Sequence, residues 1–353
     1  MTIVADHYAF VTGVDTHARS HTLAIIDARS GRELDTRTFP STPSGRGRVA
    51  RWLQRHCGTS SGVLVAMEGT NSYGATLREL LSSGGYRVIE APKPVRSLRR
   101  GQGKSDQLDA VRAARAVLSL EVDRLTEVKS DPIAQALRIL LTARAGMTRE
   151  RTASINMLLA LLRTIDLGID ARRTLSNQRI KTVAAWRCRP EATPTRIARG
   201  EASRLAKRIL EIDRHLKDNL IELTVLVQDA APELLAMPGV GPVSAAVILG
   251  SWSQPGRVRS EAALAALAGT CPLPASSGNT TRHRLNRSGD RNLNRAFHTI
   301  TLVRMSHDER TKAYVQRRTL EGRTKKEIMR SLKRYVTRQV YRTLAARSRV
   351  DKL

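Results

Sequence analysis

The sequence predicts a mixed α/β domain at the N-terminus and helices over most of the remaining chain. Short apolar runs bounded by turn residues alternate with helical spacing over residues 1–120. Residues 131–165 and 195–229 then repeat apolar residues every three or four positions, which is typical of long packed helices or a coiled coil. We therefore expect three parts, over residues 1–125, 126–230 and 231–353.

Length, hydropathy and cysteine content exclude several classes of protein. A chain of 353 residues can bury a full core in two or three domains. No apolar run approaches the roughly 20 residues of a membrane span, and the start, "MTIVADHYAF", lacks the features of a signal peptide. Cys57, Cys188 and Cys271 are scattered and form no CxxC pair, so neither a disulfide framework nor a zinc site is indicated. We expect a cytoplasmic protein with no membrane partner.

Charge is the strongest compositional signal. The chain carries 60 Lys and Arg against 32 Asp and Glu, a net charge of +28, and residues 256–353 account for +16 of it with 23 basic and 7 acidic residues. Such a surface attracts polyanions through phosphate contacts, so we expect a nucleic-acid partner and association with the nucleoid. Aromatic residues make up only 3%, which argues against base stacking as the main binding mode. A ribosome-like or merely basic bacterial protein is the alternative.

The first part is predicted to begin with three strands that form a β-meander, followed by helices and strands in alternation. The turn "RSG" separates the second strand from the third. A further loop, "RRGQGKS", precedes the last helix, and Ser105 is its predicted N-cap. The expected strands are residues 8–15, 21–27, 33–39, 62–68 and 86–91, and the expected helices are residues 44–56, 72–83 and 106–119.

Four carboxylates occupy suggestive positions in this order of elements. Asp15 ends the first strand, Glu68 ends the fourth, and Asp106 and Asp109 lie three residues apart on the last helix, so they point to the same side. Each has an ordinary explanation, as a turn residue or as an acid at the N-terminus of a helix. Together they match a site in which several oxygen ligands hold two Mg²⁺ ions about 4 Å apart for phosphodiester cleavage.

The arrangement resembles the ribonuclease-H-like fold of the RuvC Holliday-junction resolvases, in which adjacent strands and a final helix bring four carboxylates together. Beyond it, the two long helical stretches suit either an intramolecular hairpin or a dimerisation arm. The segment between them, residues 166–194, is polar, contains Pro190 and Pro194, and is interpreted as a connecting excursion.

The C-terminal part contains a helix-hairpin-helix pattern, "LLAMPGVGPVSAAVILG", over residues 234–250. Gly239 and Gly241 would let the backbone approach a DNA phosphate at the N-terminus of the following helix. The alternative is a hairpin that only packs against its neighbours.

A basic stretch follows, and its cations are expected to contact nucleic acid. Two serines, Ser276 and Ser277, precede Gly278 in a loop rich in Gly, Pro and Ser. Serine before glycine is common in loops and alone indicates nothing. The predicted nucleic-acid-binding cations of this region are Arg282, Arg284, Arg287 and Arg291.

With these motifs in order, the chain resembles the DEDD-type insertion-sequence transposases of the IS-one-ten family, which are related to the Piv DNA invertases. The resemblance rests on "GVDTHARSHTLAI", "AMEGTNSYG", "KSDQLDA", "MPGVGPVSA", "LAALAGTCPLPASSG" and "NRSGDRNLNRAF", and it covers almost the whole chain. One departure is Asn71, where the family usually has glycine. The resemblance implies a RuvC-like N-terminal domain, a helical middle and a C-terminal transposase domain.

The resemblance also implies the site and the mechanism. The family's Asp, Glu, Asp and Asp correspond to Asp15, Glu68, Asp106 and Asp109, which would bind Mg²⁺, and its serine corresponds to Ser277. That serine attacks the DNA phosphodiester and becomes linked to it, in a composite site assembled between protomers of a dimer or tetramer. Serine needs such help because it is a weak nucleophile at its free pKa. Family members also use a bridge RNA that pairs with donor and target DNA, a role compatible with a net charge of +28.

Three other functions stay open at the level of sequence. A metal-dependent junction nuclease would use water in place of Ser277. A tyrosine recombinase would use "HDER" at residues 307–310 together with Tyr341, but such enzymes need no carboxylate quartet. A non-enzymatic nucleic-acid-binding regulator could keep the fold, although the five intact site residues speak against it. A misalignment by one residue would exchange Ser276 for Ser277.

Overall fold

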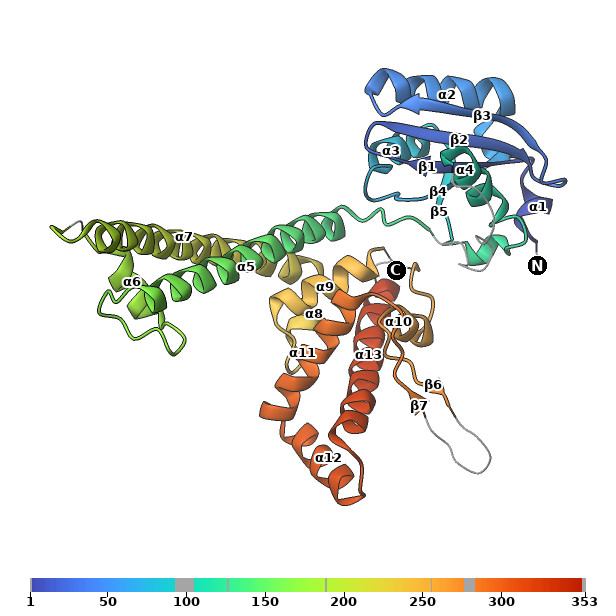
Figure 1. Ribbon diagram of the computed structural model, residues 1–353. Helices are drawn as coiled ribbons and strands as arrows, with labels where there is room; N and C mark the ends of the chain where they lie inside the picture. The colour runs from blue at the N-terminus through green and yellow to red at the C-terminus, as the bar shows by residue number, and fades with distance from the viewer. Residues whose placement is uncertain are drawn as a thin grey trace. The chain divides into compact units, whose positions relative to one another are not determined.

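The structure is a computed structural model that describes residues 2–92, 105–125, 127–187, 189–254, 256–275 and 283–350. The chain divides into two compact units, Met1–Ser130 and Asp131–Leu353. The first unit is a mixed α/β domain, and the second is almost entirely helical (Figure 1). This confirms the predicted mixed α/β start and helical remainder.

The first unit is built on one five-stranded sheet in the order β3-β2-β1-β4-β5 (Figure 1). The first three strands pair antiparallel as the predicted meander, and β1 pairs with β4, and β4 with β5, in parallel. Each strand lies within two residues of its predicted bounds. The strands are β1 (Phe10–Thr16), β2 (Ser20–Asp27), β3 (Glu33–Pro40), β4 (Val63–Met67) and β5 (Arg87–Glu90).

Helices cover both faces of this sheet, because its central strands are apolar on both sides. Helices α2 (Pro43–Cys57) and α3 (Ala75–Ser83) pack over one face, where Val14, Val65 and Leu77 are fully buried. Helix α4 (Asp106–Arg115) packs over the other face together with the short α1 (Val4–His7). The core of that second face contains Val11, Ile26, Leu64, Ile89, Ala114 and Val117.

The second unit begins with two long helices that pack against each other. Helices α5 (Pro132–Thr164) and α7 (Thr193–Ala230) run antiparallel, because early residues of one meet late residues of the other. Arg144 Nη1 donates to the backbone oxygen of Leu216 at 2.9 Å, and Arg151 forms an ion pair with Asp213. The long stretches are therefore an intramolecular hairpin, which leaves the predicted dimerisation role as a prediction.

The segment between α5 and α7 differs from the sequence interpretation. It contains a short helix, α6 (Asn177–Ala184), and supplies buried apolar side chains to a core at the end of the hairpin. The interpretation of residues 166–194 as a polar connection was wrong in this respect. Its apolar residues are dispersed over turns and a two-turn helix, so they show no regular period in the sequence. They include Leu167, Leu175, Ile180 and Val183.

The remaining helices share a core with the long hairpin. Leu137 of α5 and Leu223 of α7 belong to the same buried cluster as Trp252, Phe297 and Val340 of the C-terminal helices. The predicted boundary at residue 230 therefore falls inside one compact unit. The elements are α8 (Pro232–Leu235), α9 (Pro242–Trp252), α10 (Glu261–Leu267), β6 (Leu273–Pro274), β7 (His283–Arg284), α11 (Arg291–His307), α12 (Glu309–Leu320) and α13 (Lys325–Val350).

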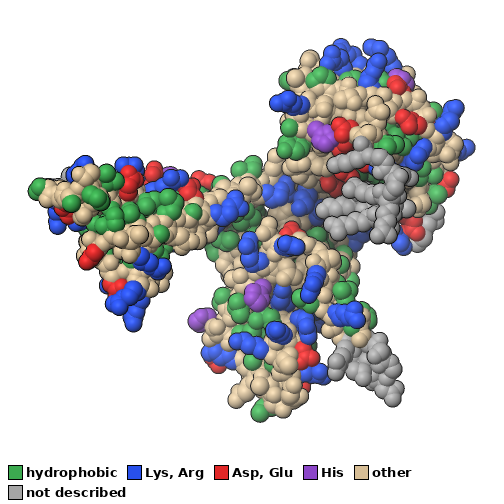
Figure 2. All heavy atoms as spheres, in the orientation of Figure 1, with side chains coloured by type: hydrophobic (Ala, Val, Ile, Leu, Met, Phe, Trp, Pro, Cys, Tyr) green, Lys and Arg blue, Asp and Glu red, His purple; other side chains and the backbone are tan. Residues whose placement is uncertain are grey.

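Basic side chains are displayed on both units. In the first unit, Lys and Arg atoms gather over α2 (Figure 2), where Arg48, Arg51 and Arg55 are exposed. In the second unit they are spread over the helices that follow α7 (Figure 2). Among the residues that the structure describes, no helix has the length and apolar character needed to cross a membrane.

Candidate active site

A close contact between a strand and a helix positions the candidate site. A Cβ atom added to Gly13 of β1 would lie 1.9 Å from the backbone oxygen of Ala110 and 2.6 Å from the backbone nitrogen of Ala114. Only glycine therefore lets α4 approach the sheet at this point. Residues two apart on a strand face the same side, so Asp15 points to the face that α4 covers. The first turn of α4 carries Asp106 and Asp109 to this end of β1.

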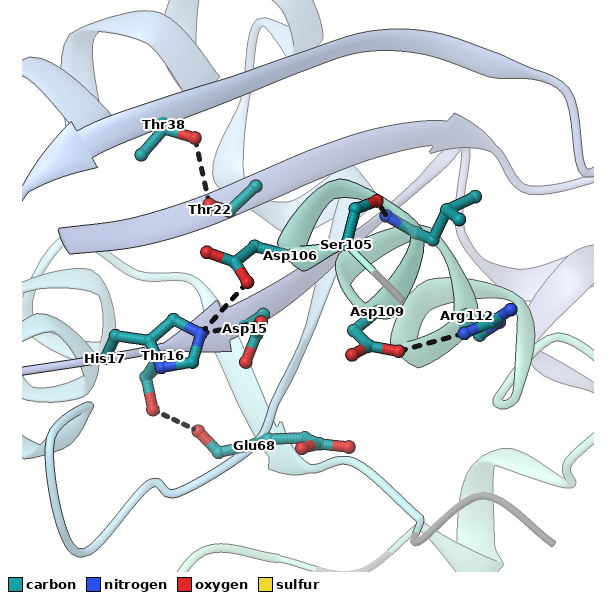
Figure 3. Close-up of polar contacts among 11 residues, drawn as sticks. Asp15, Thr16, His17, Thr22, Thr38, Glu68, Ser105, Asp106, Asp109 and Arg112 are labelled. Carbon is teal, nitrogen blue, oxygen red and sulfur yellow. Dashed lines mark hydrogen bonds and ion pairs between the residues drawn. The ribbon is translucent and has the colours of Figure 1, made fainter. Parts of the chain in front are cut away.

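The predicted N-cap of α4 is confirmed. Ser105 precedes the helix in an extended conformation, and its hydroxyl accepts a hydrogen bond from the backbone N–H of Leu108 at 3.2 Å (Figure 3). Asp106 and Asp109 both lie in the first turn, where the helix dipole stabilises negative charge. The cap therefore fixes where the helix begins, and with it the positions of both carboxylates.

A histidine that the sequence analysis did not single out joins two of these carboxylates. His17 Nε2 lies 3.1 Å from Asp15 Oδ2 and 3.4 Å from Asp106 Oδ1 (Figure 3). Candidate ligand atoms of the three residues lie within 4.8 Å of one another. The available signal was the pair Asp-x-His at the end of a strand, because residues two apart share a side of the strand.

Asp15 is the most enclosed member of this group. Its side chain is 12% exposed, against 56% for Asp106 and 18% for Asp109. Burial raises the pKa of Asp15; the neighbouring His17 opposes this rise, and the charges of Asp106 and Asp109 add to it. The charges of Asp106 and Asp109 thus disfavour ionisation of Asp15, and a bound cation would relieve this repulsion.

Asp109 and Glu68 lie beside this trio. Asp109 Oδ1 accepts a hydrogen bond from Arg112 Nη1 at 3.0 Å, one turn further along α4. Glu68 directly follows β4, and its backbone N–H donates to the oxygen of Val14 at 3.0 Å, so the parallel pairing sets it next to Asp15. Figure 3 shows its side chain below Asp15 and Asp109, on the same side of the strand ends.

The loop after Glu68 is held by several hydrogen bonds. Thr16 Oγ1 donates to the backbone oxygen of Glu68 at 2.9 Å, and Thr70 Oγ1 donates to Glu90. Asn71 Nδ2 donates to Thr70 Oγ1 at 3.1 Å and Asn71 Oδ1 accepts from Arg78 at 3.3 Å. The asparagine that replaces the family's usual glycine is therefore part of the loop's bonding.

The predicted serine lies outside the described residues. Ser277 and its rival Ser276 both fall within residues 276–282, as does Arg282. The chain enters this segment after β6 and leaves it at β7, and the two short strands pair with each other. Of the remaining predicted cations, Arg284, Arg287 and Arg291 are all exposed.

The two glycines of the predicted helix-hairpin-helix differ in their surroundings. Gly239 has a φ of +73°, and a Cβ atom there would lie 2.9 Å from the backbone oxygen of Ile300 and 3.1 Å from Arg304. Because glycine has no side chain, the backbone at Gly239 can pack closely against α11. Gly241 precedes α9 and is exposed, and a Cβ atom there would meet nothing within 4 Å. Gly241 is therefore open to a phosphate, and phosphate contact at both glycines stays a prediction.

Comparisons with known proteins bear on this geometry. Residues 12–166 match the model of the DEDD transposases of the IS110 type, described as a transposase, and residues 231–316 match the transposase IS116/IS110/IS902 family. The chain belongs to this transposase family. The first match spans Asp15, Glu68, Asp106 and Asp109, and the second spans Gly239 and Ser277.

Individual relatives cover most of this transposase's length. It is 27% identical to an insertion element IS900 protein of Mycobacterium paratuberculosis, over 74% of this chain and 77% of that protein. It is 24% identical to an insertion element IS110 protein of Streptomyces coelicolor, over 86% of each chain. It is 25% identical to the transposase for insertion sequence element IS1328 of Yersinia enterocolitica, over 73% of this chain and 75% of that one. The family that the sequence motifs predicted is therefore confirmed.

Proposed function

We propose that this transposase cuts and rejoins DNA strands with a metal-binding carboxylate site and the hydroxyl of Ser277. The observation that carries the proposal is the convergence of Asp15, His17 and Asp106 at the end of β1, with Asp109 and Glu68 beside them. The strand order β3-β2-β1-β4-β5, with a helix across β1, supports the RuvC-like reading of the first unit.

The donor set fits a hard divalent cation. Asp15, Glu68, Asp106 and Asp109 offer carboxylate oxygens, which Mg²⁺ prefers. Burial raises the pKa of Asp15, and the charges of Asp106 and Asp109 add to this rise. His17 adds a nitrogen, which Mn²⁺ and other transition metals accept more readily than Mg²⁺. A bound pair of such ions would supply activation of the attacking oxygen and stabilisation of the leaving one.

Ser277 is the proposed nucleophile. Its Oγ would attack the scissile phosphorus and lose its proton to a nearby base, while the bond from phosphorus to the leaving strand's oxygen breaks and that oxygen is protonated. The product is a serine–phosphate ester that conserves the bond energy. In the reverse step a hydroxyl of another strand attacks the ester, rejoins the DNA and returns the proton to Ser277. Ser277 is preferred over Ser276 because it directly precedes Gly278, as in the family pattern.

The partners are proposed from charge and from family resemblance. The last 98 residues carry a net charge of +16, so donor and target DNA are expected to bind chiefly through their phosphates. A bridge RNA would supply sequence specificity by base pairing. We also propose that Ser277 of one protomer meets the carboxylates of another, in a dimer or tetramer.

Mapping of the covalent adduct tests this function directly. The full-length protein is incubated with Mg²⁺, DNA of the element's ends and any RNA that co-purifies with it, and protein–DNA adducts are separated under denaturing conditions. We expect an adduct that mass spectrometry maps to Ser277. Asp106→Asn should abolish both cleavage and adduct while leaving DNA binding intact.

Ser276→Ala is the matched control, because it removes a hydroxyl from the neighbouring position. It should keep the adduct, whereas Ser277→Ala should lose it. Cleavage that survives in Ser277→Ala without an adduct would instead identify a junction nuclease that uses water. An adduct that maps to any other residue would refute the assignment.

A further inference from the structure

A basic cleft lies in the second unit, between one face of α13 and the β6–β7 hairpin. Its volume is about 1020 Å³, and its lining contains seven Lys and Arg residues and a single acidic residue, Glu327. Residues 269–272 and 283–286 form one wall, so the cleft borders the chain where it leads into and out of residues 276–282. Neither the composition of the chain nor its family matches single out this cleft.

The cations of the cleft are only partly neutralised. Arg334 and Arg338 both pair with the same carboxylate, that of Glu261. For Arg284, Arg330 and Lys333, no carboxylate within 4.0 Å is found among the described residues, and residues 276–282 contain no acid. The cleft therefore has unbalanced positive charge, which an anionic ligand would neutralise.

Lys333 is the one buried cation among the described residues that line the cleft. It is 9% exposed, and its ammonium group donates a hydrogen bond to Asn294 Oδ1 at 2.6 Å. Beside it, Arg334 Nη1 is buried and has no hydrogen-bond partner among the described residues. Burial of a hydrogen-bond donor costs free energy of folding unless an acceptor pairs with it. Phosphate oxygens are acceptors of suitable charge.

Three arginines of the cleft form a row along one face of α13. Arg330, Arg334 and Arg338 are four residues apart, so they follow one another along α13 over about 12 Å. A row of this length can contact successive phosphates of one strand.

One aromatic residue completes the lining. Tyr335 is 46% exposed, its ring packs edge to face on Tyr314 with centroids 5.9 Å apart, and the guanidinium of Arg338 lies 5.9 Å from its centroid. A ring held in this way offers a face on which an unpaired base can stack. In a duplex the bases already stack on one another, so the ring favours a single strand.

We infer that this cleft binds a single strand of DNA, with its phosphates on Arg330, Arg334, Arg338 and Lys333 and one base on Tyr335. The inference rests on the proposed function in one respect: DNA is preferred to RNA because the cleft borders the chain that leads to the proposed nucleophile. The cleft would hold the cut strand near the reaction without reading its sequence.

Fluorescence anisotropy of the full-length protein tests the inference. The probes are labelled 12-nucleotide oligo(dT), the same length of oligo(rU), and a 12-base-pair duplex, all in EDTA so that no cleavage occurs. Tyr335→Leu should weaken oligo(dT) binding about tenfold and leave duplex binding unchanged, because one stacked base is lost. Arg330→Gln should reduce the slope of log K against log salt for oligo(dT) by about 0.7.

Two variants control for folding and for charge. Tyr335→Phe keeps the ring and should bind as the wild type does. Arg342→Gln removes an exposed cation from the same helix outside the cleft lining and should change oligo(dT) binding less than twofold. A Tyr335→Leu effect no larger than that of Arg342→Gln, or one of equal size on the duplex, would overturn the inference. A preference for oligo(rU) that Tyr335→Leu abolishes would overturn the assignment to DNA.

The same assay separates this inference from the proposed function. Ser277→Ala and Asp106→Asn should bind oligo(dT) as the wild type does, because neither substitution removes a cation or an aromatic ring. If these variants keep normal cleavage while the Tyr335→Leu effect is present, the proposed function fails and the cleft stands. If they lose cleavage and Tyr335→Leu has no effect, the cleft fails and the function stands.

Discussion

The carboxylate site of the first unit and the basic cleft of the second are built in opposite ways. The carboxylate site consists of short side chains whose positions follow from the backbone, through the contact of Gly13 with α4 and the capping of α4 by Ser105. The cleft consists of long side chains from one helix face and a hairpin. A shift of the backbone is therefore expected to disrupt all the ligands of the carboxylate site together. Loss of one side chain from the cleft is expected to weaken ligand binding only in part.

This difference matches what each site is proposed to do. Metal coordination requires ligand atoms within a few tenths of an ångström of their positions, which short side chains on packed elements provide. Phosphate binding tolerates movement, because each cation contributes a separate and screened attraction. Substitutions should therefore produce loss of function at the carboxylate site and graded loss of affinity in the basic region.

The largest effect is expected from Gly13→Ala. The added Cβ would overlap backbone atoms of Ala110 and Ala114, so α4 must shift as a unit. Overpacking of this kind costs about 1–3 kcal/mol or more, and strand cleavage should fall below detection. Thermal unfolding and a cleavage assay measure the two effects.

Gly47→Ala is the control, since nothing lies within 4 Å of its Cβ in α2. It should be neutral or stabilise by up to about 1 kcal/mol. Normal cleavage by Gly13→Ala would show that the contact does not position the site.

A smaller effect, with a defined dependence on pH, is expected from Asp15→Asn. The folded pKa of Asp15 is raised, so the folded state keeps its proton longer than the unfolded state, and its contribution to stability falls as pH rises above the unfolded value of 3.8. In EDTA, Asp15→Asn should therefore gain in melting temperature relative to wild type as the pH rises above 3.8. Added Mg²⁺ should reverse the order by stabilising only the wild type.

Asp27→Asn provides a control of opposite sign for that experiment. Hydrogen bonds from Ser30 lower the pKa of Asp27, so its contribution to stability is present above the unfolded value and is lost as pH falls. Asp27→Asn should therefore lose stability relative to wild type, and more at pH 7 than at pH 3. If both variants shifted in the same direction with pH, the burial argument for Asp15 would be wrong.

The smallest effect is expected from Arg287→Gln. Arg287 is exposed in the basic stretch, and removal of one phosphate contact should lower affinity for any duplex about two- to threefold and reduce the salt slope by about 0.9. A filter-binding titration at several salt concentrations measures both. Arg172→Gln, which removes an exposed cation already paired with Asp170, should leave both unchanged. A change in sequence preference for Arg287→Gln would indicate base contact instead.

Much of the first unit could be predicted from the sequence because its determinants are local. Apolar runs and turn residues set the strands, and Ser105 marked the start of α4. Strand ends and helix spacing were enough to propose the four acidic residues. His17 was missed because its significance depends on Asp106, which is 89 positions away in the chain and meets it only in three dimensions.

The second unit was harder to predict from the sequence, for the same physical reason. The apolar side chains within residues 166–194 recur at no regular spacing. The long hairpin shares one core with the C-terminal helices, and this core brings together Leu137 and Val340, which are far apart in the sequence. Likewise, the motif "MPGVGP" predicted two phosphate-binding glycines but not the close packing of Gly239 against α11. The cleft combines residues from 269 to 338, so composition revealed its charge but not its shape.

The central claim is that the carboxylate site and Ser277 act on the same phosphodiester, and a mixed-protomer experiment tests it most directly. Chains carrying Ser277→Ala and chains carrying Asp106→Asn are purified separately, shown to be inactive alone, then mixed with DNA and Mg²⁺ in a recombination assay. We expect activity to return in the mixture, because one chain supplies the intact serine and the other the intact carboxylates. Recombination by either variant alone, or a mixture that remains inactive although its chains exchange, would contradict the shared site.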